Sequence, residues 1–215
     1  MDAMTLMNAR HSVRQYEDKP IPAEILAELK QEIAACNRES GLHIQLVTDE
    51  PKAFDGFIAH YGKFRGVKNY LALVGPKGAG LDEKCGYYGE QLVLKAQALG
   101  LNSCWVALTY RKTPGAFQSS EKLTAVIALG YGKTQGVPHK SKPLSAVSNV
   151  GSDTPDWFKA GVEAALLAPT AINQQKFTFT YADGKVSAKA GMGFYAKIDL
   201  GIVKYHFELG SNHKL

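Results

Sequence analysis

The sequence predicts a sandwich of helices on one β-sheet, of the α+β or α/β class. Three observations support this class. Segments with helical periodicity alternate along the chain with apolar runs that are typical of strands. The 215 residues, 45% hydrophobic and 21% charged, suit one folded domain covering residues 1–215. No low-complexity tract interrupts this pattern.

The first segments predict a helix followed by a strand. The helix begins near Pro20, and its apolar face comprises Ile25, Leu26, Leu29 and Ile33. We expect a polar turn over residues 37–41 and an alternating strand over residues 42–47.

The central segments predict buried elements. The runs 69–75 and 123–130 are almost continuously apolar and end in glycine, as expected for strands covered on both faces. Between them, a largely apolar helix is expected to be capped by Asp82 and to end at Gly100, with a short strand around Trp105 after it.

The last third predicts a helix, a hairpin and a second helix. Thr154 and Pro155 are a suitable start for the first helix, which Pro169 ends. Residues 177–188 form a predicted hairpin that turns at Asp183-Gly184, and residues 199–209 form a helix. The loop 134–155 suits a functional role better than a linker. A weak echo relates residues 33–47 to residues 166–181.

Composition narrows the function classes. The net charge of +5 is compatible with a phosphate, another anionic small molecule or a nucleic acid. Three scattered cysteines argue against a disulfide framework and a zinc ribbon, so we expect reduced, buried thiols. The first residues lack a secretory pattern, and no apolar run could cross a bilayer. These features predict a cytoplasmic protein with no membrane partner.

The most specific local motif is a possible phosphate clamp before the first long helix. Arg10, Ser12 and Arg14 alternate, so they share one side of an extended segment. Guanidinium forks bind phosphate oxygens bidentately, and a hydroxyl adds a hydrogen bond. The competing interpretation is a solvated basic patch.

Three other segments could contribute to a ligand site. The turn 168–177 offers small residues and the amide of Asn173 to a planar heterocycle, although a plain helix-to-strand turn is the simpler interpretation. Lys140 and Lys142 add cations in a loop that could merely be solvated. Trp105 is either a core residue or a wall for an aromatic ligand.

Other motifs are absent. The glycine-rich turns after residues 75 and 130 lack the Walker and dinucleotide-binding spacings. The six histidines show no metal-binding spacing, and no Gly-x-Ser-x-Gly elbow occurs. We interpret His206, on an apolar helix face, as a core residue. The dispersed basic residues, without a series of aromatics, argue against nucleic acid as a partner.

In their order and spacing, these segments resemble the FMN-dependent nitroreductase family, specifically its short, divergent branch. The N-terminal motif Arg10-His11-Ser12-Val13-Arg14-Gln15-Tyr16 is the most specific part. Residues 89–105 resemble the central helix and the strand edge beneath the flavin, and residues 128–142 resemble the last core strand and a second basic cluster. The resemblance covers most of the chain and implies an α+β fold with a central, mostly antiparallel sheet flanked by helices.

The resemblance also implies the residues of an FMN site. The ribityl phosphate would be bound by Arg10, His11, Ser12, Arg14, Lys140 and Lys142. The flavin ring would lie along Trp105, Val106, Ala107 and Leu108, with Lys63 or Arg65 near its pyrimidine edge. The remaining contacts would come from Pro169, Thr170, Ala171 and Asn173. No side chain is assigned as a catalytic acid or base, because the flavin is the redox centre in this family, and no metal is expected.

One departure from the family pattern is visible. Members usually carry Ala-Pro-Ser-x-x-Asn-x-Gln-Pro directly after the first helix, where this chain has residues 35–41 without that motif. A recognisable version occurs only at residues 168–177. This copy has taken over the role, or the flavin site is altered.

The resulting functional prediction is a homodimeric flavoprotein, an FMN-dependent NAD(P)H oxidoreductase. Its acceptors would be electron-poor molecules such as nitroaromatics, quinones or enones. The alternatives are a flavin reductase or dehalogenase of the same fold, and a non-catalytic protein that binds FMN or another phosphate ligand.

Overall fold

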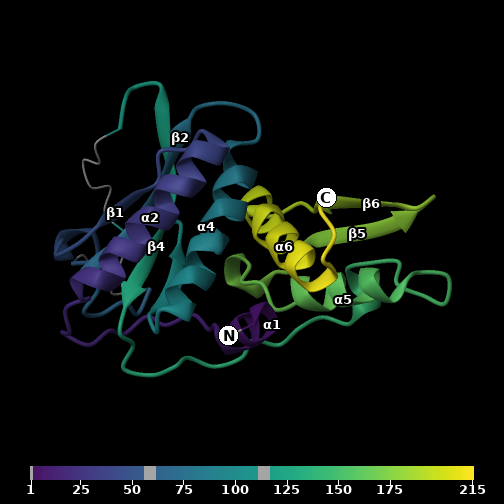
Figure 1. Ribbon diagram of the computed structural model, residues 1–215, viewed down its shortest axis with the longest axis horizontal. Coiled ribbons are helices and arrows are strands. Elements are labelled where there is room, and N and C mark those ends of the chain that lie inside the picture. The colour runs from purple at the N-terminus through teal and green to yellow at the C-terminus, as the bar shows by residue number, and fades with distance from the viewer. Residues whose placement is uncertain (1, 56–61, 111–116) are drawn as a thin grey trace. The chain divides into compact units, whose positions relative to one another are not determined.

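The computed structural model describes residues 2–55, 62–110 and 117–215, which divide into two compact units. The sheet unit comprises Arg10–Leu81 and Leu92–Val137. The hairpin unit comprises Met1–Ala9, Asp82–Gln91 and Pro138–Leu215. Figure 1 labels most of the helices and strands of both units. That residues 1–215 fold together as one domain stays a prediction, because two compact units can still fold as a single cooperative domain.

A four-stranded antiparallel sheet organises the sheet unit. Its strands lie in the order β1 (Gln45–Val47), β2 (Asn69–Pro76), β4 (Glu121–Gly130) and β3 (Asn102–Val106). The long central pair, β2 and β4, places Leu71 opposite Ile127, and both residues are fully buried. The two apolar runs are therefore central strands, as predicted, and the α+β class with an antiparallel sheet is confirmed.

Helix α2 (Ala23–Ser40) buries Leu29, Ile33 and Cys36, which confirms the predicted amphipathic helix. The expected polar turn over residues 37–41 was wrong, because the helix continues through Ser40 and ends at the left-handed Gly41. The Asn37 side chain accepts a hydrogen bond from the Ile44 amide at 2.8 Å and donates one to its carbonyl at 3.0 Å. Asn37, in the last turn of α2, thus joins the end of this helix to the backbone of Ile44 by two hydrogen bonds.

The hairpin unit contains α1 (Ala3–Ala9), α5 (Asp156–Ala165), β5 (Phe177–Ala182), β6 (Lys185–Ala190) and α6 (Ala196–Ser211). Asp183 and Gly184 both have positive φ at the predicted hairpin turn. Phe179 stacks on Phe207 of α6 with ring centroids 4.6 Å apart, so the hairpin and this helix share an aromatic core.

Two helix starts differ from expectation. Helix α4 (Leu81–Ala98) begins after the left-handed Gly80, so Asp82 lies inside the first turn and is not the cap. Helix α6 begins at Ala196, three residues before the expected Asp199, after the left-handed Tyr195. In both cases a residue in the left-handed conformation sets the first residue of the helix. The helix preferences of the neighbouring residues do not predict that position. Helix α1 was not predicted.

The 3₁₀ turns are η1 (Pro51–Ala53), η2 (Leu144–Ala146) and η3 (Ala171–Asn173). The three cysteines are buried and unbridged, as predicted. Among the described residues, no helix has the length and apolar content needed to cross a bilayer, and no cluster of side chains has the composition of a metal site.

Candidate functional site

The segment that carries the predicted phosphate clamp runs extended along the edge of the sheet unit. Ser12 pairs with Ser103 of β3 in parallel, and the Val13 amide donates to the Ser103 carbonyl at 3.0 Å. Further on, the Glu17 amide donates to the Tyr131 carbonyl at 2.8 Å. These backbone bonds fix the side to which each alternate side chain points.

The three predicted clamp side chains each lower the pKa of one buried thiol, that of Cys104. Burial raises the pKa of Cys104, whereas the charge of Arg14, a hydrogen bond from Ser12 and the charge of Arg10 each lower it. The Ser12 hydroxyl is therefore in hydrogen-bond contact with Cys104, and the charges of Arg10 and Arg14 lie within electrostatic reach of the same thiol. Arg10 is only 3% exposed, and its Nε and Nη1 donate no hydrogen bond to any described residue. A buried guanidinium is suited to binding an anion through charge-assisted hydrogen bonds.

The other candidates beside the clamp differ in how closely they approach it. The Arg65 amide donates to the Arg14 carbonyl, and the Tyr16 amide donates to the Arg65 carbonyl, both at 3.0 Å. Arg65 therefore lies directly beside the clamp backbone, with an exposed side chain. Lys63 is exposed and left-handed. His11 lies against the backbone of Gly136, whose positive φ and close approach leave no room for a side chain.

The predicted flavin-facing strand follows the clamp contact directly. Trp105 is half-buried in β3, opposite Ile127 of β4, two residues after the Ser103 that pairs with Ser12. Val106 is buried, and the strand ends there. Ala107 is half-buried and Leu108 is 71% exposed. The segment Trp105 to Leu108 thus leads from the sheet core to the surface.

The Asn-bearing turn is a second cluster of candidates, and it lies in the hairpin unit. Pro169 is buried, and the Thr170 hydroxyl accepts a hydrogen bond from the Gln175 amide at 3.0 Å. Non-glycine residues with positive φ follow at Ile172, Asn173 and Gln175. Such a run is uncommon for L-residues, and a β-branched residue such as isoleucine is especially strained there.

Gln175 joins this turn to the predicted basic cluster. Its side-chain amide donates to the Lys140 carbonyl at 2.8 Å and accepts from the Lys142 amide at 2.8 Å. The Asn173 side chain donates to the same Lys140 carbonyl at 2.9 Å. The Lys142 ammonium donates to the carbonyl oxygens of Gln174 and Gln175 at 2.8 and 3.1 Å. Lys140, Lys142, Thr170 and Asn173 are therefore brought together, and the Lys142 charge caps the turn.

Asp199 holds the same turn from helix α6. Its carboxylate accepts hydrogen bonds from the Ala171 amide at 3.0 Å and from the Gln174 side chain at 2.7 Å. The residue is 3% exposed, and burial raises the pKa of its carboxyl group from 3.8 to about 6, against the opposing effect of these two bonds. Among the described residues, the hydrogen-bond partners of this buried carboxylate come from the turn, and none of them is a cation.

Sequence reasoning missed Cys104, Gln175 and Asp199. Cys104 was interpreted only as a buried thiol, and Gln175 only as part of a polar turn. Asp199 was assigned to the start of a helix, which begins one turn earlier. An acidic residue within the first turn of a helix is common, so no local signal separates it from an ordinary one.

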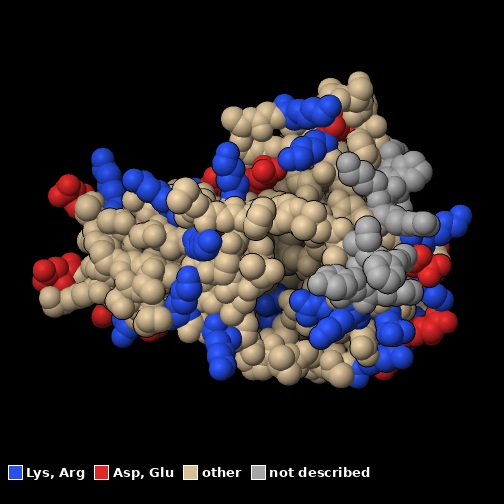
Figure 2. Space-filling model, turned by 180° about the vertical axis from the view of Figure 1, so that it is seen from behind, with Lys and Arg blue, Asp and Glu red and all other residues tan. Residues whose placement is uncertain are grey.

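Charged side chains are dispersed over much of the surface. Figure 2 shows Lys and Arg side chains spread over the visible face, with acidic groups among them at several places. His206, predicted to be a core residue, is fully buried and bonded to Glu90 and the Ala164 carbonyl.

A family model described as "Putative TM nitroreductase" matches residues 2–211 of this chain. The chain belongs to this nitroreductase family. The predicted family resemblance is thereby confirmed. No curated protein matches the chain.

Solved structures support the fold assignment. A putative nitroreductase from Thermotoga maritima MSB8 has a TM-score of 0.68 and 22% identity, over 98% of this chain and 83% of that one. A putative nitroreductase in complex with FMN from Desulfovibrio desulfuricans has a TM-score of 0.54 and 20% identity, over 68% and 95% of the chains. A putative NADH dehydrogenase/NAD(P)H nitroreductase from Parabacteroides distasonis ATCC 8503 has a TM-score of 0.52 and 18% identity, over 72% and 99%.

Proposed function

We propose that this nitroreductase-family chain binds FMN and transfers electrons from NAD(P)H to nitroaromatic, quinone or enone acceptors. The proposal is supported chiefly by the hydrogen bond of Ser12 to Cys104 and by the charges of Arg10 and Arg14 acting on the same thiol. Solved relatives support the choice of cofactor and donor, because one is described in complex with FMN and another as an NAD(P)H nitroreductase.

The clamp residues fit the phosphate group of FMN. Two guanidiniums provide charge-assisted hydrogen bonds to a dianion, and the bonds are strong at a partly desolvated position such as Arg10. The Ser12 hydroxyl adds a donor, and His11 extends the same segment. Bound FMN would supply the chemistry of hydride acceptance and electron transfer.

Other candidates are proposed from the family resemblance. Trp105, Val106, Ala107 and Leu108 offer the flavin ring an apolar strand end and a backbone N–H. Lys63 and Arg65 supply cations for its pyrimidine edge, where positive charge favours an anionic ring. Lys140, Lys142, Pro169, Thr170, Ala171 and Asn173 are proposed to contribute from their turn, in which the Lys142 ammonium already binds carbonyl oxygens.

We also propose a cytoplasmic homodimer with no nucleic-acid partner. Multi-angle light scattering of the purified protein tests the dimer. A mass of one chain at micromolar concentration would contradict it.

The experiment that tests the main proposal is a visible spectrum of the purified protein, with cofactor released by heat and identified by chromatography. Anaerobic addition of NADH or NADPH to the FMN-loaded protein then tests the donor. We expect a flavin spectrum that bleaches with one of the two donors. A colourless protein that does not bind added FMN would contradict the proposal.

A non-catalytic FMN- or phosphate-binding protein is the second candidate. One observation favours it: residues 35–40 continue α2 where most family members have their Asn-bearing turn. This candidate predicts bound FMN that neither nicotinamide reduces. A flavin reductase or dehalogenase of the same fold would instead show bleaching without turnover of nitroaromatics.

A further inference from the structure

Two buried polar side chains of the sheet unit pack against the clamp segment, residues 10–16. Tyr16 is 3% exposed and Cys104 is 2% exposed. Both belong to one cluster of buried residues, which also includes Val13 of the clamp segment. A hydroxyl or thiol in an apolar core normally has a hydrogen-bond partner, so the partners of these two groups indicate what they hold in place.

The Tyr16 hydroxyl holds the backbone of the clamp segment. It donates to the Val13 carbonyl at 2.8 Å, and the Ala128 carbonyl of β4 lies 3.3 Å away as a second acceptor for the same hydrogen. Val13 stands between Ser12 and Arg14 in the chain. A bond to its carbonyl therefore fixes the backbone at the point from which both clamp side chains project.

The Cys104 thiol contacts the clamp through Ser12. Burial raises the pKa of this thiol, whereas the charge of Arg14 and a hydrogen bond from Ser12 lower it. Ser12 pairs with Ser103, the neighbour of Cys104 in β3, and this pairing brings the hydroxyl to the thiol. The Cys104 sulfur itself donates to the Trp105 carbonyl at 3.5 Å. With its proton directed at that carbonyl, the sulfur is the acceptor for the Ser12 hydroxyl.

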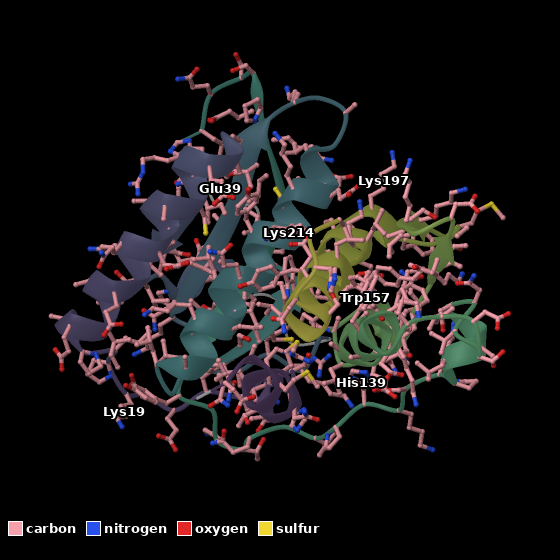
Figure 3. The ribbon with its side chains drawn as sticks, turned by 45° about the vertical axis from the view of Figure 1, so that its right-hand side comes forward. Lys19, Glu39, His139, Trp157, Lys197 and Lys214 are labelled. Atoms are coloured by element: carbon pink, nitrogen blue, oxygen red, sulfur yellow. The ribbon has the colours of Figure 1, made fainter. Side chains whose placement is uncertain are left out.

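The end of the segment beyond Tyr16 is fixed by separate contacts. The Glu17 amide donates to the Tyr131 carbonyl at 2.8 Å. The Lys19 ammonium lies 4.1 Å from the centroid of the Tyr131 ring, and Figure 3 labels this lysine. Loss of the Tyr16 hydroxyl or of the Cys104 thiol should therefore leave the segment in place and change only the direction of its side chains.

We propose that Tyr16 and Cys104 are positioning residues of the clamp, which hold Ser12 and the backbone of Arg14 in the arrangement that a phosphate group requires. This inference rests on the proposed function and adds two residues that act through the clamp. Sulfur is a weak acceptor, so the Ser12 hydroxyl can turn from it to a phosphate oxygen at little cost. Positioning before binding increases affinity, because less conformational freedom is lost when the ligand binds.

The test is a fluorescence titration of the protein without cofactor, with FMN and with riboflavin. The ratio of the two dissociation constants isolates the contribution of the phosphate group. Tyr16→Phe and Cys104→Ala are each expected to lower this ratio about fivefold, with the affinity for riboflavin unchanged. Cys104→Ser is expected to retain the wild-type ratio, because a hydroxyl also accepts a hydrogen bond from Ser12.

Two buried residues of the same unit provide matched controls. The Tyr70 hydroxyl donates to Glu50 Oε2 at 3.2 Å, so Tyr70→Phe removes a hydroxyl from the same cluster that holds a different residue. Cys36→Ala removes a fully buried thiol from α2. Both variants are expected to keep the wild-type ratio even where they lower the free energy of unfolding.

The outcomes separate this inference from the proposed function. Equal affinity of wild-type protein for FMN and riboflavin would contradict the clamp and, with it, this inference. A wild-type preference for FMN that persists in Tyr16→Phe or in Cys104→Ala would overturn this inference alone. Equal losses of affinity for both flavins would also overturn it, because the change would then concern the fold and not the clamp. If Tyr16→Phe does not fold, Cys104→Ala and Cys104→Ser decide, and equal ratios in these two would overturn it.

Discussion

Gly86 of α4 and Gly201 of α6 occupy equivalent positions in a reciprocal helix crossing. A Cβ on Gly86 would overlap the Ile198 carbonyl oxygen, and one on Gly201 would overlap the Glu83 carbonyl oxygen. An offset of 115 residues therefore relates each glycine to the other and each overlapped carbonyl to its counterpart. The two backbones approach so closely that neither position accommodates a side chain.

Alanine at either glycine is expected to destabilise the protein by about 3 kcal/mol, because the helices must separate. This reverses the usual effect in helices, where alanine is favoured over glycine by about 1 kcal/mol. Urea unfolding of Gly86→Ala and Gly201→Ala measures the change. Gly78→Ala is the control, since nothing lies within 4 Å of a Cβ at that position. A stabilised Gly201→Ala would contradict the crossing.

The same offset of 115 residues also relates two strands of the chain. Shifted by 115 residues, β2 (Asn69–Pro76) coincides with β6 (Lys185–Ala190). Among the elements of the described residues, α2, β1, β2 and α4 have the same order of helix, strand, strand, helix as α5, β5, β6 and α6 if the short 3₁₀ turns are left aside. In sequence this was only a weak echo between residues 33–47 and 166–181, at an offset of 133 to 134 residues rather than 115. The two offsets differ because the chain between the two strands is longer in the first half than in the second, so no single register aligns both halves in sequence.

Other parts of the fold were predictable because their signals are local. The apolar runs of β2 and β4, the Asp183-Gly184 turn and the apolar face of α2 each depend on neighbouring residues alone. The starts of α4 and α6 depend on left-handed residues, and Tyr195 has no preference that would indicate one. At the candidate site, alternation grouped Arg10, Ser12 and Arg14, and their joint binding of a phosphate stays a prediction. The partners of Asp199 are 25 and 28 residues away, beyond any local pattern.

Glu90 and His206 form a fully buried pair with a 3.0 Å contact between Oε1 and Nε2. Glu90→Leu leaves the His206 nitrogen buried without this partner, so we expect a loss of about 3 kcal/mol in the free energy of unfolding. Glu90→Leu/His206→Leu removes both polar groups and is expected to recover most of that loss. Calorimetry of the two variants tests this. A double variant as unstable as the sum of both single changes would refute it.

Asp199 makes stability depend on pH. Because its folded pKa, about 6, exceeds its ordinary value of 3.8, the folded state holds the proton more tightly. This contribution is fully present below pH 3.8 and is lost as pH rises through 6, which amounts to roughly 1 kcal/mol between pH 5 and 7.5. Asp199→Asn is expected to remove that part of the pH dependence. Asp183→Asn, at the exposed hairpin turn, is the control and should retain it. Parallel pH profiles for wild type and Asp199→Asn would contradict the assignment.

The chain is expected to unfold in one transition, because the single helix α4 supplies residues to both units. The two tryptophans provide separate reporters, Trp105 in the sheet unit and Trp157 in the hairpin unit. Fluorescence of Trp157→Phe and Trp105→Phe during urea unfolding follows one unit each. After correction for the stability of each variant, coincident midpoints support one domain, whereas separate midpoints would show two.

The most direct test of the central claim compares FMN with riboflavin, which lacks the phosphate. Fluorescence titration of the protein without cofactor gives both dissociation constants. The account predicts that wild type binds FMN at least 100-fold more tightly, and that Arg10→Ala/Arg14→Ala reduces this preference to less than fivefold while circular dichroism stays unchanged. Arg38→Ala, exposed in the last turn of α2, should keep the wild-type preference. Equal affinity of wild type for the two flavins, or an undiminished preference in the double variant, would contradict a phosphate clamp at Arg10, Ser12 and Arg14.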